Sequence, residues 1–282
     1  MVKYRNSSFQ SVGFHVLCTL IALLAMYPLL WMLASSFKEP EKVFVDAHSL
    51  IPQVWNFSNF ARGWQGFAGI TFATFYKNTI IVVLLSTAGM IASCSWIAYG
   101  FARIPFRFKK FWFATVMITL LLPSQIILIP QYIIFYKMHW VNTILPLVVP
   151  SFFGSAFFIF LIMQFIRTIP DELDESAKID GCSRFAVFFR IVLPLIVPAI
   201  VTTAIFQFYW SWENFFDAMI YLGRPKMYTL GVALRMFSDP TSHTDWSGMF
   251  AMASLSILPP IAVFFIFQRY IVDGISTTGL KG

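Results

Sequence analysis

Long apolar stretches alternate with short polar segments along this 282-residue chain. Six of the stretches contain no Asp, Glu, Lys or Arg, and each is longer than the about 20 residues that a helix needs to cross about 30 Å of hydrocarbon. A helix satisfies its own backbone hydrogen bonds, so it is the natural spanning element in lipid. The pattern predicts an all-α membrane protein with six transmembrane helices, at approximately residues 12–36, 78–102, 111–134, 146–166, 191–212 and 247–268.

Proline recurs inside these stretches, for example at Pro28, Pro123, Pro130 and Pro198. Proline removes a helical hydrogen bond and can kink the helix, and membrane helices tolerate it when neighbours or water satisfy the freed group. Kinked helices suit a translocation path with two conformations. They also occur in static bundles, so the prolines alone do not distinguish these two interpretations.

The composition supports a membrane protein, because 58% of the residues are hydrophobic and only 12% are charged. A soluble domain carries about a quarter charged residues. The net charge of +7 comes from basic residues at the ends of the apolar stretches, so it reflects membrane topology and not nucleic-acid binding. We therefore expect membrane lipid as a partner and no nucleic acid.

The three cysteines, Cys18, Cys94 and Cys182, show no metal-ligand spacing. We expect neither a metal site nor a disulfide framework. The first apolar stretch continues to Phe37 and is longer than the core of a cleaved signal peptide. The sequence therefore predicts a retained first span and a single transmembrane domain over residues 1–282.

Basic residues indicate the orientation in the membrane. Twelve Lys and Arg lie in segments on the side of the N-terminus, and eight lie in the opposite loops, although the opposite loops are much longer. The densest cluster is Arg103, Arg107, Lys109 and Lys110. Because cytoplasmic segments carry an excess of Lys and Arg, we expect both termini in the cytoplasm. The long aromatic outer loops suit contact with an external partner, or interfacial anchoring by Trp and Phe.

A short charged segment interrupts the apolar pattern between the fourth and fifth stretches. Pro170 suits the first turn of a helix, the acidic residues after it suit the positive end of the helix dipole, and Gly181 suits a C-terminal stop. Ser183 is placed to cap a second helix. Leu173 and Ala177 are four residues apart and share a helix face. Such a helix suits a groove in a partner protein, but a solvated connector between two spans would have the same composition.

This segment also carries a family resemblance. It contains Glu175-Ser176-Ala177, then Asp180-Gly181-Cys182 and Ile191-Val192-Leu193-Pro194-Leu195, and so resembles the EAA loop of ABC-importer permeases. Further segments resemble the same family: Tyr99-Gly100-Phe101-Ala102-Arg103, Pro123-Ser124-Gln125, Ile129-Pro130, Pro259-Pro260, Gln268-Arg269-Tyr270 and Gly279-Leu280-Lys281-Gly282. The resemblance covers nearly the whole chain and is to MalG-like permeases of the carbohydrate-uptake class. Ser176 departs from the usual alanine, and its small size should not block docking.

The resemblance implies a type I ABC importer permease fold, with a cytoplasmic coupling helix in an EAA-like loop over residues 167–190. It implies an ATP-driven importer of a sugar or oligosaccharide in the bacterial cytoplasmic (inner) membrane. The implied partners are a second permease subunit, two cytoplasmic ATPase subunits and an external solute-binding protein. The residues that it implies for ATPase docking are Glu172, Leu173, Glu175, Ser176, Ala177, Asp180 and Gly181.

The outer end of the fifth stretch combines aromatic, amide, hydroxyl and acidic side chains, which are the groups that bind sugars. Related permeases use the corresponding region for substrate contacts. The expected substrate-path residues are Gln207, Trp210, Ser211, Asn214 and Asp217. Trp210 would also suit an interfacial belt, and Asp217 would also suit the water boundary. The loop from Gly223 to Trp246 resembles an external loop that reaches into the binding protein in some relatives.

The chain contains no Gly-x-x-x-x-Gly-Lys-Ser/Thr phosphate loop. We therefore expect no enzyme activity and no cofactor in this chain, with ATP and Mg bound by the partner ATPase subunits. Glycerol-3-phosphate or another small polar solute is an alternative substrate. An ion-coupled secondary transporter is an alternative of another class, but such proteins place ionisable residues near the midplane, where His15 is the only candidate.

Overall fold

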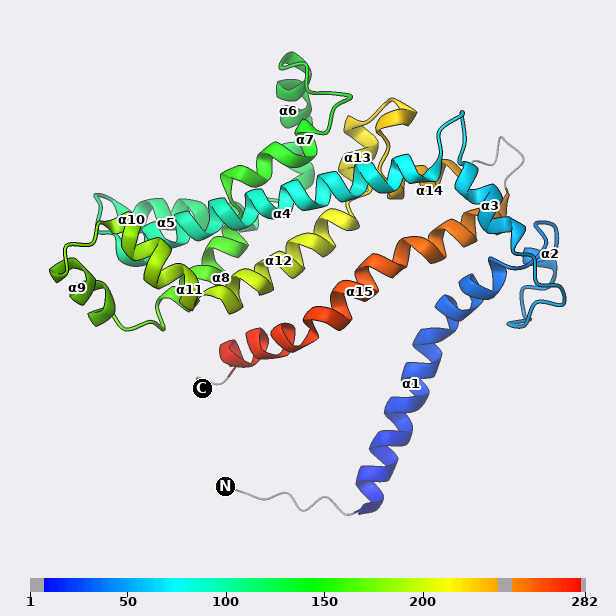
Figure 1. Ribbon diagram of the computed structural model, residues 1–282, viewed down its shortest axis with the longest axis horizontal. Coiled ribbons are helices and arrows are strands. Elements are labelled where there is room, and N and C mark those ends of the chain that lie inside the picture. The colour runs from blue at the N-terminus through cyan, green and yellow to red at the C-terminus, as the bar shows by residue number, and fades with distance from the viewer. Residues whose placement is uncertain (1–7, 238–244, 280–282) are drawn as a thin grey trace. The chain divides into compact units, whose positions relative to one another are not determined.

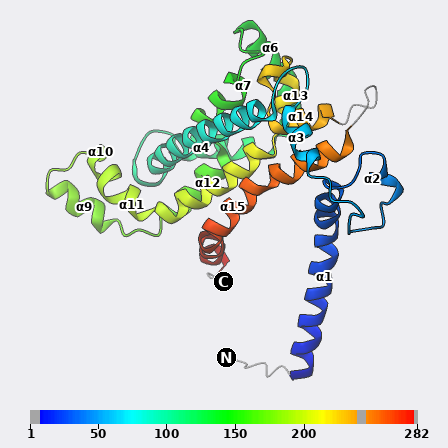
Figure 2. The same ribbon diagram turned by 45° about the vertical axis from the view of Figure 1, so that its right-hand side comes forward.

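The computed structural model of the chain describes residues 8–237 and 245–279, and these ranges are mainly helical, with one isolated backbone bridge between Phe67 and Ile70 (Figures 1 and 2). The helices are α1 Ser8–Ser35, α2 Lys42–Val45, α3 Ser58–Gln65, α4 Phe72–Arg103, α5 Lys109–Ile118, η1 Thr119–Leu121, α6 Ser124–Lys137, α7 Leu145–Val148, η2 Val149–Phe153, α8 Ala156–Ile166, α9 Glu172–Ile179, α10 Arg184–Val187, η3 Phe188–Val192, α11 Leu193–Leu195, α12 Val197–Trp212, α13 Phe216–Tyr221, η4 Pro225–Met227, α14 Leu230–Phe237 and α15 Trp246–Gly279.

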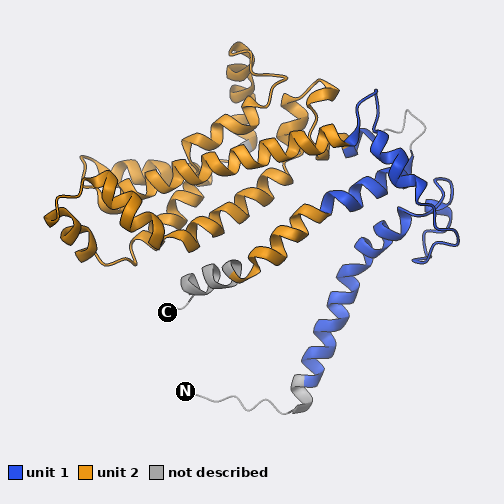
Figure 3. Cartoon of the chain, in the orientation of Figure 1, with its two compact units in different colours: residues 1–72, 234–257 blue, residues 73–233, 258–282 orange. Residues whose placement is uncertain are grey.

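Two compact units make up the chain (Figure 3). Unit 1 comprises Met1–Phe72 and Leu234–Ile257, and unit 2 comprises Ala73–Ala233 and Leu258–Gly282. The charged segment around α9 and the C-terminal end of α12 both belong to unit 2. The residues predicted for docking and for the substrate path therefore lie within one unit.

Four helical segments are long and apolar enough to cross a membrane as they stand: Val12–Ser35, Phe72–Arg103, Leu145–Ile166 and Trp246–Arg269. Two bent pairs also pass this test, namely Lys109–Leu121 with Gln125–Lys137, bent by 103°, and Arg184–Leu195 with Val197–Trp212, bent by 74°. When each bent pair counts as one span, the described residues provide six. These six follow one another in the order of the six apolar stretches.

The third apolar stretch is broken at Pro123, where the sequence pattern predicted one continuous helix. Leu122, the residue before the proline, is extended, with ψ of 119°. The ring of a proline disfavours helical backbone in the preceding residue, so α5 and η1 end there and α6 starts anew at Ser124. Pro130, by contrast, lies inside α6.

The fifth apolar stretch contains a second break. Residues Phe188–Val192 form a π-helical turn, and Ile196, with φ of −92° and ψ of 9°, separates α11 from α12. Pro194 and Pro198 lie in the first turns of α11 and α12, where the missing N–H of proline costs little. The bend therefore places α10 and η3 at an angle to α12, next to the segment that carries α9.

The core of unit 2 is an apolar cluster contributed by α4, α8, the α10–η3 segment and α12. Helix α8 buries six of its eleven residues, among them Phe158, Ile162 and Met163. Lipid tails are as apolar as these side chains, so close packing and polar contacts hold such a cluster together, more than expulsion from water does. Polar contacts lie at two places next to this cluster, one beside α9 and one at the C-terminal end of α12.

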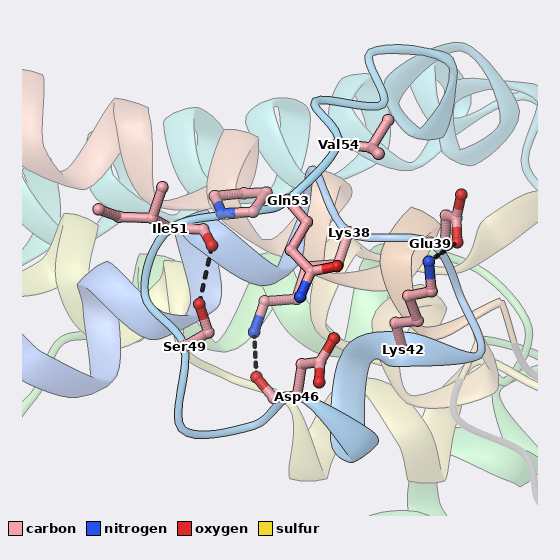
Figure 4. A pocket seen from close by; sticks show the side chains of 9 residues that line it. Lys38, Glu39, Lys42, Asp46, Ser49, Ile51, Gln53 and Val54 are labelled. Carbon is pink, nitrogen blue, oxygen red and sulfur yellow. Dashed lines mark hydrogen bonds and ion pairs between the residues drawn. The ribbon is translucent and has the colours of Figure 1, made fainter.

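In unit 1, the segment after α1 is held by buried polar contacts. The amide of Asn59 is fully buried and donates to the backbone carbonyls of Ser36 and Lys38, both at 2.8 Å. Lys38 Nζ donates to the carbonyl of Asp46 at 2.8 Å, beside the ion pair of Lys42 with Glu39 (Figure 4). The cavity in Figure 4 has a volume of only about 20 Å³, so it suits a single water better than a solute.

Candidate functional site

The charged segment forms the helix α9, which begins at Glu172. The sequence pattern predicted Pro170 in the first turn of this helix. In the structure, Pro170 precedes the helix. Glu172, Asp174 and Glu175 lie in the first turn and Lys178 in the last, and both placements complement the helix dipole.

The C-terminal end of α9 is a Schellman motif. The N–H of Gly181 donates to the carbonyl of Lys178 at 3.0 Å, and the N–H of Cys182 donates to the carbonyl of Ala177 at 2.9 Å. Gly181 has φ of +78°, a left-handed conformation that glycine adopts without the steric cost of a Cβ. The predicted stop at Gly181 is confirmed, and Ser183 caps α10 by accepting a hydrogen bond from the N–H of Ala186 at 3.3 Å.

One face of α9 is buried and the other is exposed. Ala177 packs into the core cluster, whereas Leu173 is 43% exposed. These two residues were expected to present one apolar face to a partner, and only Leu173 is available for that. Ile179 is 87% exposed, and the sequence pattern did not single it out. The other predicted docking residues lie on the exposed side: Glu172, Glu175, Ser176, Asp180 and Gly181.

Arg103, the last residue of α4, connects three parts of this region. Its Nη2 donates to the backbone carbonyls of Ile166, at 3.1 Å, and of Ile169. Its Nη1 forms an ion pair with Asp171, and its Nε lies 3.6 Å from Oδ2 of Asp174. Burial of a charge is costly unless the charge is paired and hydrogen-bonded, and the buried guanidinium of Arg103 meets both conditions. We term these contacts the Arg103 clasp.

The sequence pattern used Arg103 only as an orientation signal. A second signal was available, because Asp171 and Asp174 are three residues apart and so face the same side of a helix. Two acids on one face next to an arginine at a span end favour a buried ion pair. The pairing itself depends on how α4, α8 and α9 pack.

All five predicted substrate-path residues line one cavity of about 200 Å³ within unit 2. They are Gln207, Trp210, Ser211, Asn214 and Asp217. Further lining residues come from α6, from α7 and η2, and from α13, and the sequence pattern did not single them out. They are Gln131, Pro146, Leu147, Pro150, Ser151 and Tyr221.

Hydrogen bonds organise the polar wall of this cavity. Ser211 Oγ lies 2.6 Å from Oγ of Ser86 on α4, and Gln207 Nε2 donates to Ser211 Oγ at 3.3 Å. Asn214 Nδ2 donates to Oδ2 of Asp217 at 3.0 Å, and the N–H of Asp217 donates to Oδ1 of Asn214 at 3.2 Å. Each of these side chains is therefore held in place before any solute arrives.

Aromatic rings support the same cavity. The ring of Trp210 lies 4.9 Å from that of Phe158, and the ring of Tyr221 stacks on Tyr132 at 6.1 Å, centroid to centroid. The hydroxyl of Tyr221 is buried and has no hydrogen-bond partner among the described residues. Burial raises the pKa of Tyr221, and Asp217 raises it further, so the phenol remains protonated and can donate a hydrogen bond.

The loop after α13 begins next to the N-terminal part of α4. Asn78 Nδ2 donates to the carbonyls of Lys226 and Tyr228, at 2.9 and 3.0 Å, and the N–H of Leu230 donates to Oγ1 of Thr79 at 2.8 Å. Part of the loop from Gly223 to Trp246, including Asp239 to His243, lies outside the described residues.

Comparisons with known proteins agree with these features. Residues 88–277 match the family described as binding-protein-dependent transport system inner membrane component. The chain is 35% identical to the probable ABC transporter permease protein YurM of Bacillus subtilis (strain 168), over 91% of this chain and 84% of that protein. It is 29% identical to the arabinooligosaccharides transport system permease protein AraQ of Halalkalibacterium halodurans, over 93% of each chain.

A solved structure has the same fold. It is a chain of a bacterial ABC transporter involved in the import of the acidic polysaccharide alginate, with a TM-score of 0.82, 21% sequence identity and coverage of 96% of this chain and 99% of that chain. The expectation of an all-α membrane protein with an ABC importer permease fold is thereby confirmed. The chain is a multi-pass membrane protein that belongs to the family of binding-protein-dependent transport system inner membrane components.

Proposed function

We propose that this chain is a permease subunit that forms, with a second permease subunit, the path for an uncharged sugar or oligosaccharide delivered by an external binding protein. One observation carries the proposal. In a chain of this transport family, amides, hydroxyls, an indole and a carboxylate converge on one cavity. Planar polar groups match the hydroxyl edges of a sugar, and an aromatic face matches its C–H surface. The family assignment also favours this function over ion-coupled secondary transport.

The charge of the cavity favours an uncharged solute. Asp217 is the one carboxylate among the described lining residues, and none of those residues is Lys, Arg or His. A phosphate or uronate group would meet this carboxylate without a compensating cation, and like charges at short distance repel strongly inside a protein. Glycerol-3-phosphate and acidic oligosaccharides are therefore disfavoured as substrates.

The similar proteins include transporters of both neutral and acidic sugars. AraQ is named for arabinooligosaccharides, whereas the transporter of similar fold imports an acidic polysaccharide. A likeness at 21% identity extends to the fold alone. The acidic cavity of this chain supports a solute of the first kind.

The energy for transport would come from two cytoplasmic ATPase subunits that bind ATP and Mg. We propose that α9 seats in a groove of one of them, with the exposed Leu173 and Ile179 as its apolar contacts and Glu172, Glu175 and Asp180 as its polar rim. This role requires that the loop 167–190 and both termini lie in the cytoplasm. The orientation can be tested with single cysteines at Lys109 and Lys226: impermeant reagents should label position 226 from outside and position 109 only from inside, and the reverse pattern would refute it.

Uptake measurements test the cavity. Asn214→Ala and Asp217→Asn should each lower the rate of sugar uptake by about tenfold or change the preferred sugar. The first removes a preorganised polar contact worth about 1–1.5 kcal/mol, and the second replaces a charged hydrogen-bond acceptor by a neutral one. The matched control is Glu213→Gln, an exposed neighbour that does not line the cavity. Unchanged uptake kinetics for every neutral sugar tested, with both cavity variants, would remove this cavity from the path.

Co-purification tests the docking role of α9. Ile179→Asp and Glu175→Lys should release the ATPase subunits and abolish uptake, while the permease still inserts into the membrane. Glu213→Lys, which places the same charge reversal outside α9, should retain them. If both α9 variants retain the ATPase subunits and transport normally, α9 is only a connector.

A further inference from the structure

We propose that the Arg103 clasp is the joint through which α9 moves the wall of the solute cavity, with Arg103 as a positioning residue. The inference rests on the proposed function, since it assumes that α9 docks on an ATPase subunit. A displacement of α9 must still reach the cavity wall, which α4 contacts near its middle.

The clasp acts at the start of α9. Arg103 contacts the chain immediately before α9 and within its first turn, through Ile169, Asp171 and Asp174. It also binds the carbonyl of Ile166 at the end of α8, where the negative end of the helix dipole favours a cation. One guanidinium thus fixes the start of α9 to the C-terminal ends of α4 and α8.

Helix α4 also holds the chain after α9. Tyr99, one turn before Arg103, has its hydroxyl 3.2 Å from the carbonyl of Arg184, to which it donates. The ring of Trp96 packs against Phe185 and Phe188, with centroids 5.0 and 4.8 Å apart. The end of α4 therefore grips both sides of α9, so α9 cannot shift without moving α4 or breaking these contacts.

The same helix, α4, also reaches the wall of the cavity. Ser86 lies on α4 seventeen residues before Arg103, which is about 25 Å along the helix at 1.5 Å per residue. Its hydroxyl lies 2.6 Å from Ser211, a lining residue of the cavity. Coupling between distant sites is carried by rigid elements and hydrogen-bonded contacts, and α4 supplies both between α9 and Ser211.

The clasp is also adjustable. Oδ1 of Asp174 is buried and has no hydrogen-bond partner among the described residues, and Oδ2 lies 3.6 Å from Arg103 Nε, which is longer than a hydrogen bond. A small displacement of α9 towards α4 would close this gap. Arginine suits the position because its planar fork reaches carboxylates and carbonyls at once, whereas lysine offers a single point charge.

The test uses the complete transporter, reconstituted in lipid nanodiscs with its ATPase subunits and binding protein. The variants are Arg103→Gln, Asp174→Asn and the double variant, with Arg107→Gln as the control because Arg107 is exposed and stacks on the ring of Phe108. For each, we would measure retention of the ATPase subunits, thermal stability, basal ATP hydrolysis and the stimulation of hydrolysis by the loaded binding protein.

Arg103→Gln should retain the ATPase subunits and basal hydrolysis within about twofold and lose at least about tenfold in stimulation and in sugar uptake. Arg107→Gln should match the wild type. Arg103→Gln leaves the buried carboxylate of Asp174 unpaired, whereas the double variant removes that charge, so its thermal stability should recover relative to Arg103→Gln. Its stimulation should stay lost, because the joint is still absent.

Two results would overturn the inference. One is full stimulation in Arg103→Gln. The other is a double variant that recovers stimulation together with stability, because Arg103 would then serve only to hold the fold. Failure of the wild-type chain to retain ATPase subunits would overturn the proposed function itself, and the inference with it. Retention is measured separately from the stimulation of hydrolysis, so the two failures can be distinguished.

Discussion

Replacement of Gly181 by alanine tests whether the end of α9 matters for docking. Gly181 has φ of +78°, and a Cβ built there would have no atom within 4 Å. The substitution therefore causes no clash, and its cost is confined to the backbone. For an L-residue with a Cβ, left-handed backbone costs about 1–2 kcal/mol.

If the ATPase groove binds only the intact Schellman motif, the free-energy cost of left-handed backbone at position 181 weakens binding of the ATPase subunit. A difference of about 1.4 kcal/mol is tenfold in an equilibrium constant, so about 1–2 kcal/mol predicts an affinity for the ATPase subunit about 5–30-fold weaker. Gly181→Asn should lose less, since asparagine adopts this conformation more readily than other non-glycine residues. The expected order of affinities is glycine, then asparagine, then alanine.

The assay is a titration of labelled ATPase subunit onto the permease in nanodiscs, followed by fluorescence anisotropy. Gly100→Ala is the matched control, because Gly100 lies inside α4 with open space around it. In the free permease the exposed end of α9 can relax out of the left-handed conformation, so thermal unfolding of Gly181→Ala should be nearly unchanged and the cost should appear on docking. An alanine variant with wild-type affinity, or an asparagine variant that binds more weakly than alanine, would refute the reasoning.

Three further predictions follow from buried contacts. Gly63→Ala should destabilise the protein by about 1–3 kcal/mol in thermal unfolding, because the new Cβ would lie 2.8 Å from the backbone oxygen of Gly248; a stable variant would show that this close approach is not needed. Ser211→Ala should lower the free energy of unfolding by about 1 kcal/mol, because it removes the contact of 2.6 Å with Ser86. An unchanged melting temperature would contradict this prediction. Burial lowers the pKa of Lys38 from 10.5, and Asp46 only partly offsets this. Between the lowered pKa and 10.5 the unfolded chain binds more protons, so stability rises with pH there. The stability of wild type relative to Lys38→Met should therefore increase over that range, and a constant difference would contradict the burial of the charge.

The apolar pattern predicted the membrane class, the number of spans and their order, because crossing about 30 Å of hydrocarbon demands a charge-free helix of about 20 residues. The sequence also predicted the end of α9, because the left-handed backbone at Gly181 is a local requirement that favours glycine. The same pattern did not reveal the breaks at Pro123 and Ile196. Proline inside an apolar stretch is compatible with a continuous helix, as Pro130 shows, so its effect depends on the surrounding packing.

Residue types at the end of α12 and just after it suggested a polar site, because Gln207 and Ser211 are one turn apart on α12, and Asn214 and Asp217 follow within six residues. The remaining cavity wall comes from Gln131 and other residues that are distant in sequence. The same division holds for α9. Its helical character follows from its own residues, but its orientation depends on Arg103, about seventy residues earlier. Local geometry is encoded by neighbours along the chain, whereas pairing between separate helices is decided only when the packed fold brings their side chains within a few ångströms of each other.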